Sequence, residues 1–129
     1  MATVSIIDDD CIVREAIGDL VQSLGYDAAT FDSAEHFLDS ELLATTSCLI
    51  TDLQMPGLNG LELQGKLLAH GHSMPVIFVT AFPEEKSRQR ALSAGAIGFL
   101  SKPFNEAALI DCLESALSIV PDHAEPSAV

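Results

Sequence analysis

The chain has 129 residues, of which 48% are hydrophobic and 19% charged, a composition typical of one globular domain with a single core. Its formal net charge of −13, from 19 acidic and 6 basic residues, argues against nucleic-acid binding, because a DNA-binding face needs clustered lysine and arginine. No apolar run approaches the roughly 18 residues of a membrane span and we find no secretory signal, so we expect a cytoplasmic protein.

The first part of the chain predicts two strands around one helix. Residues 3–7 (TVSII) form a continuous apolar run, as expected of a strand that is covered on both faces of a parallel sheet. An apolar stripe at helical spacing predicts a helix over residues 12–24, which Gly25 ends as a C-terminal cap. The run over residues 27–31 (DAATF) is weaker, so we expect an edge strand there.

The middle part repeats the alternation. Residues 32–43 predict a helix that begins at Asp32, with Glu35 completing a variant of the capping box. An apolar run that ends in two polar residues predicts a covered strand over 48–52. After a turn, residues 59–71 predict a third helix with a capping box of its own.

The last part predicts two more covered strands, over residues 76–80 (VIFVT) and 97–100 (IGFL). Pro83, followed by two glutamates, begins the helix between these strands. Asn105 begins a fifth helix. The wide spacing of the three cysteines predicts buried thiols acting as small hydrophobic residues, not a metal site or a disulfide framework; they are Cys11, Cys48 and Cys112.

Strand and helix alternate five times, which predicts an α/β fold with a doubly wound, five-stranded parallel sheet. We expect one domain over residues 1–120 and a flexible tail or linker start over 121–129, where two prolines interrupt any periodicity. In such sheets ligands bind at the carboxyl ends of the strands, so this rim is the place to look for a site.

Polar side chains stand at the predicted carboxyl ends of the central strands. In chain order they are Asp8, Asp9 and Asp10, then Asp52, then Thr80, then Ser101 and Lys102, which Pro103 follows. Converging carboxylates repel one another unless a cation neutralises them, and oxygen-only ligands favour Mg²⁺ or Mn²⁺. A hydroxyl and an ammonium beside Asp52 suit a phosphoryl group, with Asp52 as the nucleophile.

Each of these residues also has an ordinary explanation. The three aspartates could form a solvated turn, Asp52 could cap a turn, Thr80 could be a β-branched strand residue, and Lys102 could be a surface lysine. Their joint occurrence at the ends of four strands favours a site over four coincidences.

The blocks IIDDDCIVREAI, LITDLQMPGLNGLEL, VIFVTA and GAIGFLSKPF resemble, in order and spacing, those of the receiver (phosphoacceptor) domains of bacterial two-component response regulators. The resemblance covers residues 3 to about 119 and rests above all on D-L-x-M-P-x-x-x-G followed by a strand-terminal threonine and K-P-F. It is strongest to the subgroup that controls nitrogen-fixation genes, whose members usually carry a C-terminal helix-turn-helix domain. The implied fold is flavodoxin-like, (βα)5, with strand order 2-1-3-4-5.

The resemblance also implies roles for the acidic residues. Asp52 would take the phosphoryl group from a histidine kinase. Asp9 would bind Mg²⁺ directly, Asp8 would hold it through water, and Asp52 and the backbone carbonyl of Gln54 would complete the protein ligands. Asp10 would be a charge at the rim, outside the metal pair.

The remaining implied roles concern phosphoryl contacts and switching. Thr80 would donate to the phosphoryl oxygens, Lys102 would pair with them, and Phe99 would turn inward when Thr80 moves. The structural positions would be Pro56 and Gly60, which shape the loop after the acceptor, and Pro103, whose peptide bond with the preceding lysine is cis in the family.

The implied function is a phosphorylation-activated signalling switch that assists its own phosphorylation and dephosphorylation but is not an enzyme in the usual sense. It would change the surface of the fourth helix, fifth strand and fifth helix to control a partner or an output domain, with transcription regulation as the output of a longer regulator. Its partner would be a sensor histidine kinase or a phosphotransfer protein, with a phosphorylation-dependent homodimer as a possible form. We expect no membrane contact.

Two alternatives come from other functional classes. One is a Mg²⁺-dependent aspartyl phosphohydrolase, which is disfavoured because Gln54 stands where a second acidic residue would act as general acid. The other is a receiver that binds partners independently of phosphorylation.

Overall fold

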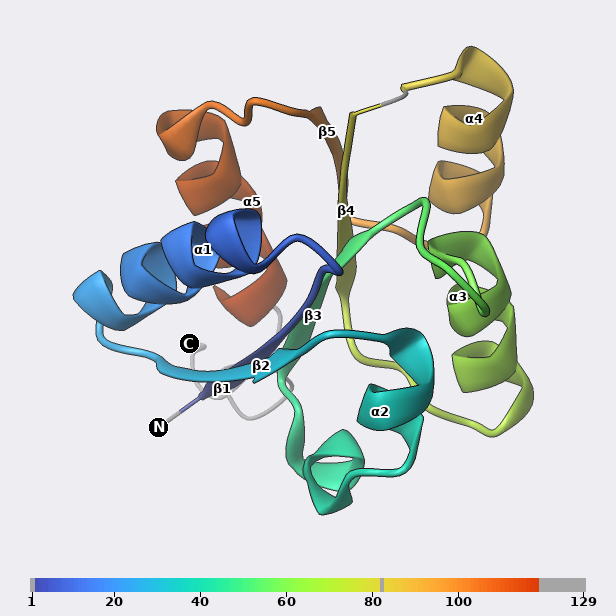
Figure 1. The fold of residues 1–129 in the computed structure, drawn as a ribbon, viewed down its shortest axis with the longest axis horizontal. Coiled ribbons are helices and arrows are strands. Elements are labelled where there is room, and N and C mark those ends of the chain that lie inside the picture. The colour runs from blue at the N-terminus through green and yellow to red at the C-terminus, as the bar shows by residue number, and fades with distance from the viewer. Residues whose placement is uncertain (1, 82, 119–129) are drawn as a thin grey trace, which may run out of the picture.

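Five parallel strands form one sheet in the computed structural model of the chain, which describes residues 2–81 and 83–118 (Figure 1). The strands are β1 (Thr3–Ile7), β2 (Asp27–Phe31), β3 (Cys48–Asp52), β4 (Val76–Thr80) and β5 (Gly98–Ser101). Their order is β2-β1-β3-β4-β5, which confirms the predicted topology. The predicted tail over residues 121–129 lies outside the described residues.

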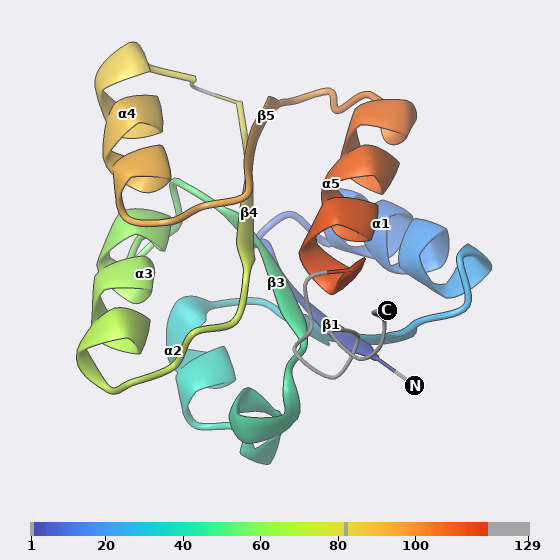
Figure 2. The same cartoon turned by 180° about the vertical axis from the view of Figure 1, so that it is seen from behind.

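Helices cover both faces of the sheet. They are α1 (Cys11–Ser23), α2 (Ala34–Leu38), α3 (Gly60–Ala69), α4 (Glu85–Ser93) and α5 (Glu106–Ser118), with a short 3-10 helix, η1 (Glu41–Thr45). Figures 1 and 2 show α1 and α5 together on one face and α2, α3 and α4 on the other. None of the helices within the described ranges is long and apolar enough to cross a membrane.

Successive side chains of the central strands point to opposite faces, so each strand contributes to two cores. Ile50 packs with residues of α1 and α5, whereas its neighbour Leu49 packs with residues of α2 and α3. All residues of β3 and β4 are buried, as the continuous apolar runs predicted. The prediction was wrong for β5, which is only partly covered because it is an edge strand.

The helix ends follow local capping chemistry. Asn59 and Glu62 form the predicted capping box of α3. The single helix predicted over residues 32–43 was wrong at both ends. The Ser33 side chain, and not Asp32, accepts the hydrogen bond from His36 N and caps α2. The helix then ends at Leu38, and η1 follows as a separate 3-10 helix. Capping at Ser33 buries Ala34 and Phe37 against the sheet.

The surface of the described region is unevenly charged. Three of the six basic residues of the chain lie on α4: Lys86, Arg88 and Arg90.

A buried hydrogen bond connects α3 and α4. The side-chain amide of Gln64 on α3 donates to the backbone oxygen of Ala91 on α4 at 3.1 Å.

The cysteines do not behave alike. Cys48 is buried, Cys112 is half-buried, and Cys11 is exposed. The prediction of a buried thiol was therefore wrong for Cys11, the first residue of α1, which faces away from the core.

Candidate functional site

Parallel pairing brings the ends of the central strands to one rim of the sheet. Ile7 at the end of β1 pairs with Thr51, and Asp52 pairs with Val79. Asp8 and Thr80 each follow directly on one of these paired residues. The predicted site residues from three strands therefore lie at the same edge.

Three carboxylates converge at this rim. One oxygen from each of Asp8, Asp9 and Asp52 lies within 4.8 Å of the others. Asp8 is 1% exposed and Asp52 is 6% exposed, whereas Asp9 is open to solvent. Two buried anions therefore share a site that one exposed anion completes.

Lys102 supplies the opposite charge. Its ammonium nitrogen lies 2.9 Å from Asp8 Oδ2 and 3.0 Å from Asp52 Oδ2. The backbone N–H of Lys102 donates to the carbonyl oxygen of Thr80 at 2.8 Å, so β4 helps to fix the start of this side chain. One cation thus bridges two buried carboxylates and leaves the cluster negatively charged.

The charge balance changes the proton affinities. Burial raises the pKa of the Asp8 carboxyl and the Asp52 carboxylate adds to this increase, while the hydrogen bond from Asp10 N and the contact with Lys102 oppose it. Burial alone would lower the pKa of Lys102, but its hydrogen bonds to Asp8 and Asp52 prevail and raise it. The Lys102 ammonium therefore stays charged, whereas ionisation of Asp8 is less favourable than that of an exposed aspartate.

Thr80 and Phe99 lie on β4 and β5, the two strands that follow β3 in the sheet. Thr80, the last residue of β4, is fully buried and pairs with Ser101. Phe99 on β5 is half-buried, and its ring centroid lies 6.1 Å from that of Phe78. The aromatic side chain is thus packed on one side and partly open to solvent on the other.

The loop after β3 stays close to Asp52. Gln54 N donates to Asp52 Oδ1 at 3.3 Å, and Gly60 N donates to the carbonyl oxygen of Leu53 at 2.8 Å. A Cβ at position 60 would lie 2.5 Å from the Asp52 carbonyl oxygen and 2.9 Å from the Phe78 ring. Only glycine therefore allows α3 to begin so close to the acceptor strand.

The two prolines among the predicted residues occupy different positions. Pro56 is exposed in the loop after β3. The peptide bond between Lys102 and Pro103 is cis.

Some residues that support the site were missed in the sequence. Arg14 Nη1 donates to the Asp8 carbonyl oxygen at 2.7 Å, and no local pattern indicates this contact. Asp10 was predicted as a charge at the rim, but its side chain also accepts from Ile12 N at 2.9 Å and caps α1. That role could have been found, because an aspartate directly before a helical stripe is a typical N-cap.

The donor set fits a hard divalent cation. Asp8, Asp9 and Asp52 offer carboxylate oxygens only, and Gln54 adds a backbone carbonyl in the adjacent loop. Such oxygens are preferred by Mg²⁺ and Mn²⁺, and the excess negative charge of the cluster favours a cation. Lys102, which bridges Asp8 and Asp52, places its positive charge against Oδ2 of Asp52.

Comparison with known proteins gives consistent matches. The family model described as "Response regulator receiver domain" matches residues 4–114. The transcriptional regulatory protein TdiR of Thauera aromatica is 35% identical over 118 residues, which cover 92% of this chain and 52% of TdiR. FixJ of Azorhizobium caulinodans is 40% identical over 114 residues, which cover 88% of this chain and 54% of FixJ.

A solved structure of the response regulator StyR has the same fold. It matches with a TM-score of 0.85 at 42% sequence identity, and the match covers 92% of this chain and 60% of that chain. The chain thus spans about half the length of the curated relatives that it matches.

Proposed function

The chain belongs to the family of response regulator receiver domains, the phosphorylation-activated switches of two-component systems, and on this basis we propose that Asp52 is its phosphoacceptor. The observation that carries the proposal is the cluster in which Lys102 bridges Asp8 and Asp52 at the carboxyl rim of the sheet. A receiver domain is phosphorylated by a histidine kinase, so the phosphoryl donor is the phosphohistidine of a sensor kinase or a phosphotransfer protein.

The transfer is a substitution at phosphorus. A carboxylate oxygen of Asp52 attacks the phosphorus, and the new O–P bond forms as the N–P bond of the phosphohistidine breaks. The imidazole nitrogen leaves with the electron pair of that bond. Asp9, Asp52 and the Gln54 carbonyl would hold Mg²⁺ directly and Asp8 would hold it through water, and the ion would supply charge neutralisation between the carboxylates and the phosphoryl oxygens.

The residues of the chain then hold the product. Lys102 already contacts Asp52 and pairs with a phosphoryl oxygen once the acceptor is modified. Thr80 donates its hydroxyl to another oxygen, and its movement makes room for Phe99 to turn inward. This repacks the surface formed by α4, β5 and α5, which a partner or an output domain reads.

Further features stay predictions from the sequence. They are the nitrogen-fixation-like subgroup, the domain limit at residue 120, phosphorylation-dependent dimerisation, the lack of nucleic-acid binding and a cytoplasmic location. The names of TdiR and FixJ support transcription regulation as the output, which would require a further domain in the full-length regulator.

The test is the intact mass of the protein after incubation with Mg²⁺ and acetyl phosphate. We expect one phosphoryl group on the wild type, removed by hydroxylamine as an acyl phosphate, and none on Asp52→Asn. Asp10→Asn is the matched control, because it removes a neighbouring charge and keeps an N-cap side chain. Phosphorylation of Asp52→Asn at the wild-type rate would refute the assignment.

A further inference from the structure

The loop after β3 is held from outside by a residue of α2. Leu58 N donates to Glu35 Oε2 at 2.9 Å, although 23 residues separate the two in the chain. This hydrogen bond stabilises the charged carboxylate and therefore lowers the pKa of Glu35. The bond joins two elements that no strand pairing connects.

Gly57 leaves the space that this carboxylate occupies. Its φ of +78° lies in the left-handed region that favours glycine. A Cβ at this position would also lie 2.6 Å from Glu35 Oε2. The backbone conformation therefore favours glycine here, and a larger residue would also push the Glu35 carboxylate from its present position.

The helix that carries Glu35 is well anchored, although the carboxylate itself is exposed. Ala34 and Phe37, the neighbours on the inner side of α2, are fully buried. The ring of Phe37 packs edge-on against Phe31 of β2 with centroids 5.3 Å apart. Glu35 therefore extends toward the loop from a fixed support.

The same loop carries backbone groups that lie beside the acceptor. Gln54 N donates to Asp52 Oδ1, and the Gln54 carbonyl is the backbone ligand in the proposed metal site. The bond from Gly60 N to the Leu53 carbonyl closes the loop at its base, and the Met55 side chain is buried in the core beneath it. The bond from Leu58 N to Glu35 adds a polar contact from a different element to this apolar packing.

We propose that Glu35 is a positioning residue for the Asp52 site, acting through the loop over residues 53–59. This inference rests on the proposed phosphoacceptor function. Without the Glu35 carboxylate the loop loses its polar contact with α2 and keeps only its apolar packing, so the distance from the Gln54 carbonyl to Asp52 varies more. Small displacements of this kind weaken metal binding and slow group transfer.

The test compares Glu35→Ala, which removes the acceptor, with Glu35→Gln, which keeps an acceptor oxygen and loses the charge. Glu41→Ala on η1 is the matched control, because it removes an exposed glutamate in the same region. Two quantities are measured for each protein: the Mg²⁺ dissociation constant from amide chemical shifts, and the initial rate of phosphorylation by acetyl phosphate. The urea midpoint confirms that each variant is folded.

We expect Glu35→Ala to weaken Mg²⁺ binding and slow phosphorylation by about three- to tenfold, at or below the lower end of the range for outer-shell partners of a metal site. Glu35→Gln should restore both values to within about twofold of the wild type, which a purely charge-based effect would not do. If Glu35→Ala matches Glu41→Ala, or if Glu35→Gln fails as badly as Glu35→Ala, the positioning role is refuted. A wild-type protein that takes up no phosphoryl group would instead refute the function on which the inference rests.

Discussion

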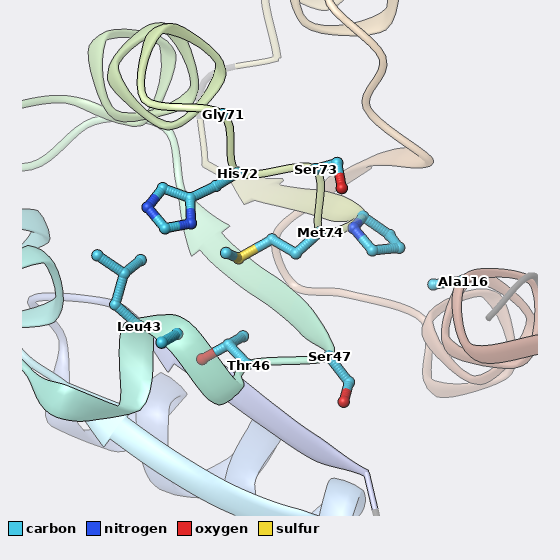
Figure 3. A pocket seen from close by; sticks show the side chains of 10 residues that line it. Leu43, Thr46, Ser47, Gly71, His72, Ser73, Met74 and Ala116 are labelled. Atoms are coloured by element: carbon cyan, nitrogen blue, oxygen red, sulfur yellow. The ribbon is translucent and has the colours of Figure 1, made fainter. Parts of the chain in front are cut away.

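The two rims of the sheet differ in kind. At the amino ends of β3 and β4 lies a cavity of about 450 Å³, between η1 and the loop before β4 (Figure 3). Figure 3 shows His72 and Met74 on one side of it and Leu43 and Thr46 on the other, and none of the described residues that line it is Asp, Glu, Lys or Arg. The carboxyl rim instead concentrates three carboxylates and an ammonium.

The comparison of the two rims shows that a cavity alone does not create a reactive site. In a parallel sheet with crossover helices, the carboxyl rim faces the amino ends of those helices, where free N–H groups and the helix dipole favour anions. The amino rim faces helix carboxyl ends and lacks this advantage. Charge therefore gathers where the fold can stabilise it, and the following experiments test how far the two rims differ.

The largest effect is expected from crowding the carboxyl rim. Gly60→Ala should lower the free energy of unfolding by about 3 kcal/mol, because the new methyl group would overlap the Asp52 carbonyl and the Phe78 ring. Gly65→Ala on the same helix has open space and should raise stability by about 0.5–1 kcal/mol. Urea denaturation of both variants is the measurement, and equal effects would show that the close approach at Gly60 is unimportant.

Adding Mg²⁺ tests whether the carboxylates of the carboxyl rim bind a cation. At a free concentration of 100 times the dissociation constant, the ion should raise the unfolding free energy by about 2.7 kcal/mol. Asp9→Asn should weaken this response at a fixed Mg²⁺ concentration, whereas Asp10→Asn should keep it. Urea curves with and without Mg²⁺ give the values. An undiminished response in Asp9→Asn would show that the ion does not bind at the carboxyl rim.

The pKa of Asp8, which is raised mainly by burial, predicts a smaller and pH-dependent contribution to stability. The folded protein binds this proton more tightly than the unfolded chain does, so the Asp8 contribution to stability rises as the pH falls through the raised pKa toward 3.8. The difference in stability between wild type and Asp8→Asn, measured without Mg²⁺, should therefore shift in favour of the wild type over that interval. A shift in the opposite direction would mean that Lys102 dominates the site.

The smallest effect is expected at the amino rim. His72→Ala removes a half-buried side chain from the cavity wall and should change the unfolding free energy by no more than about 0.5 kcal/mol. Phosphorylation by acetyl phosphate should keep its wild-type rate. A loss of phosphoryl uptake in this variant would break the comparison, because the two rims would then be coupled.

Much of the fold was predictable because its signals are local. Continuous apolar runs identify β1, β3 and β4 as covered strands, and the residues that follow them mark the carboxyl rim. The start of α2 was missed because Asp32 and Ser33 can both cap a helix, and only the burial of Phe37 selects between them. Local chemistry alone left that choice open.

The supports of the site were beyond prediction for a different reason. The bonds from Leu58 N to Glu35 and from Gln64 to the Ala91 carbonyl join residues 23 and 27 positions apart. Neither contact leaves a pattern in the sequence, since one partner in each is a backbone N–H or carbonyl group and not a particular side chain. The exposed position of Cys11 likewise depends on the phase of α1 against the sheet.

The uneven charge of the surface has a consequence in solution. A molecule with a formal charge of −13 that carries three of its six basic residues on α4 has an uneven electrostatic field. Before any contact forms, the field of a charged partner turns such a molecule so that α4 faces the negative side of that partner. The rate of encounter then falls as added salt shortens the range of the field, to about 8 Å at physiological ionic strength.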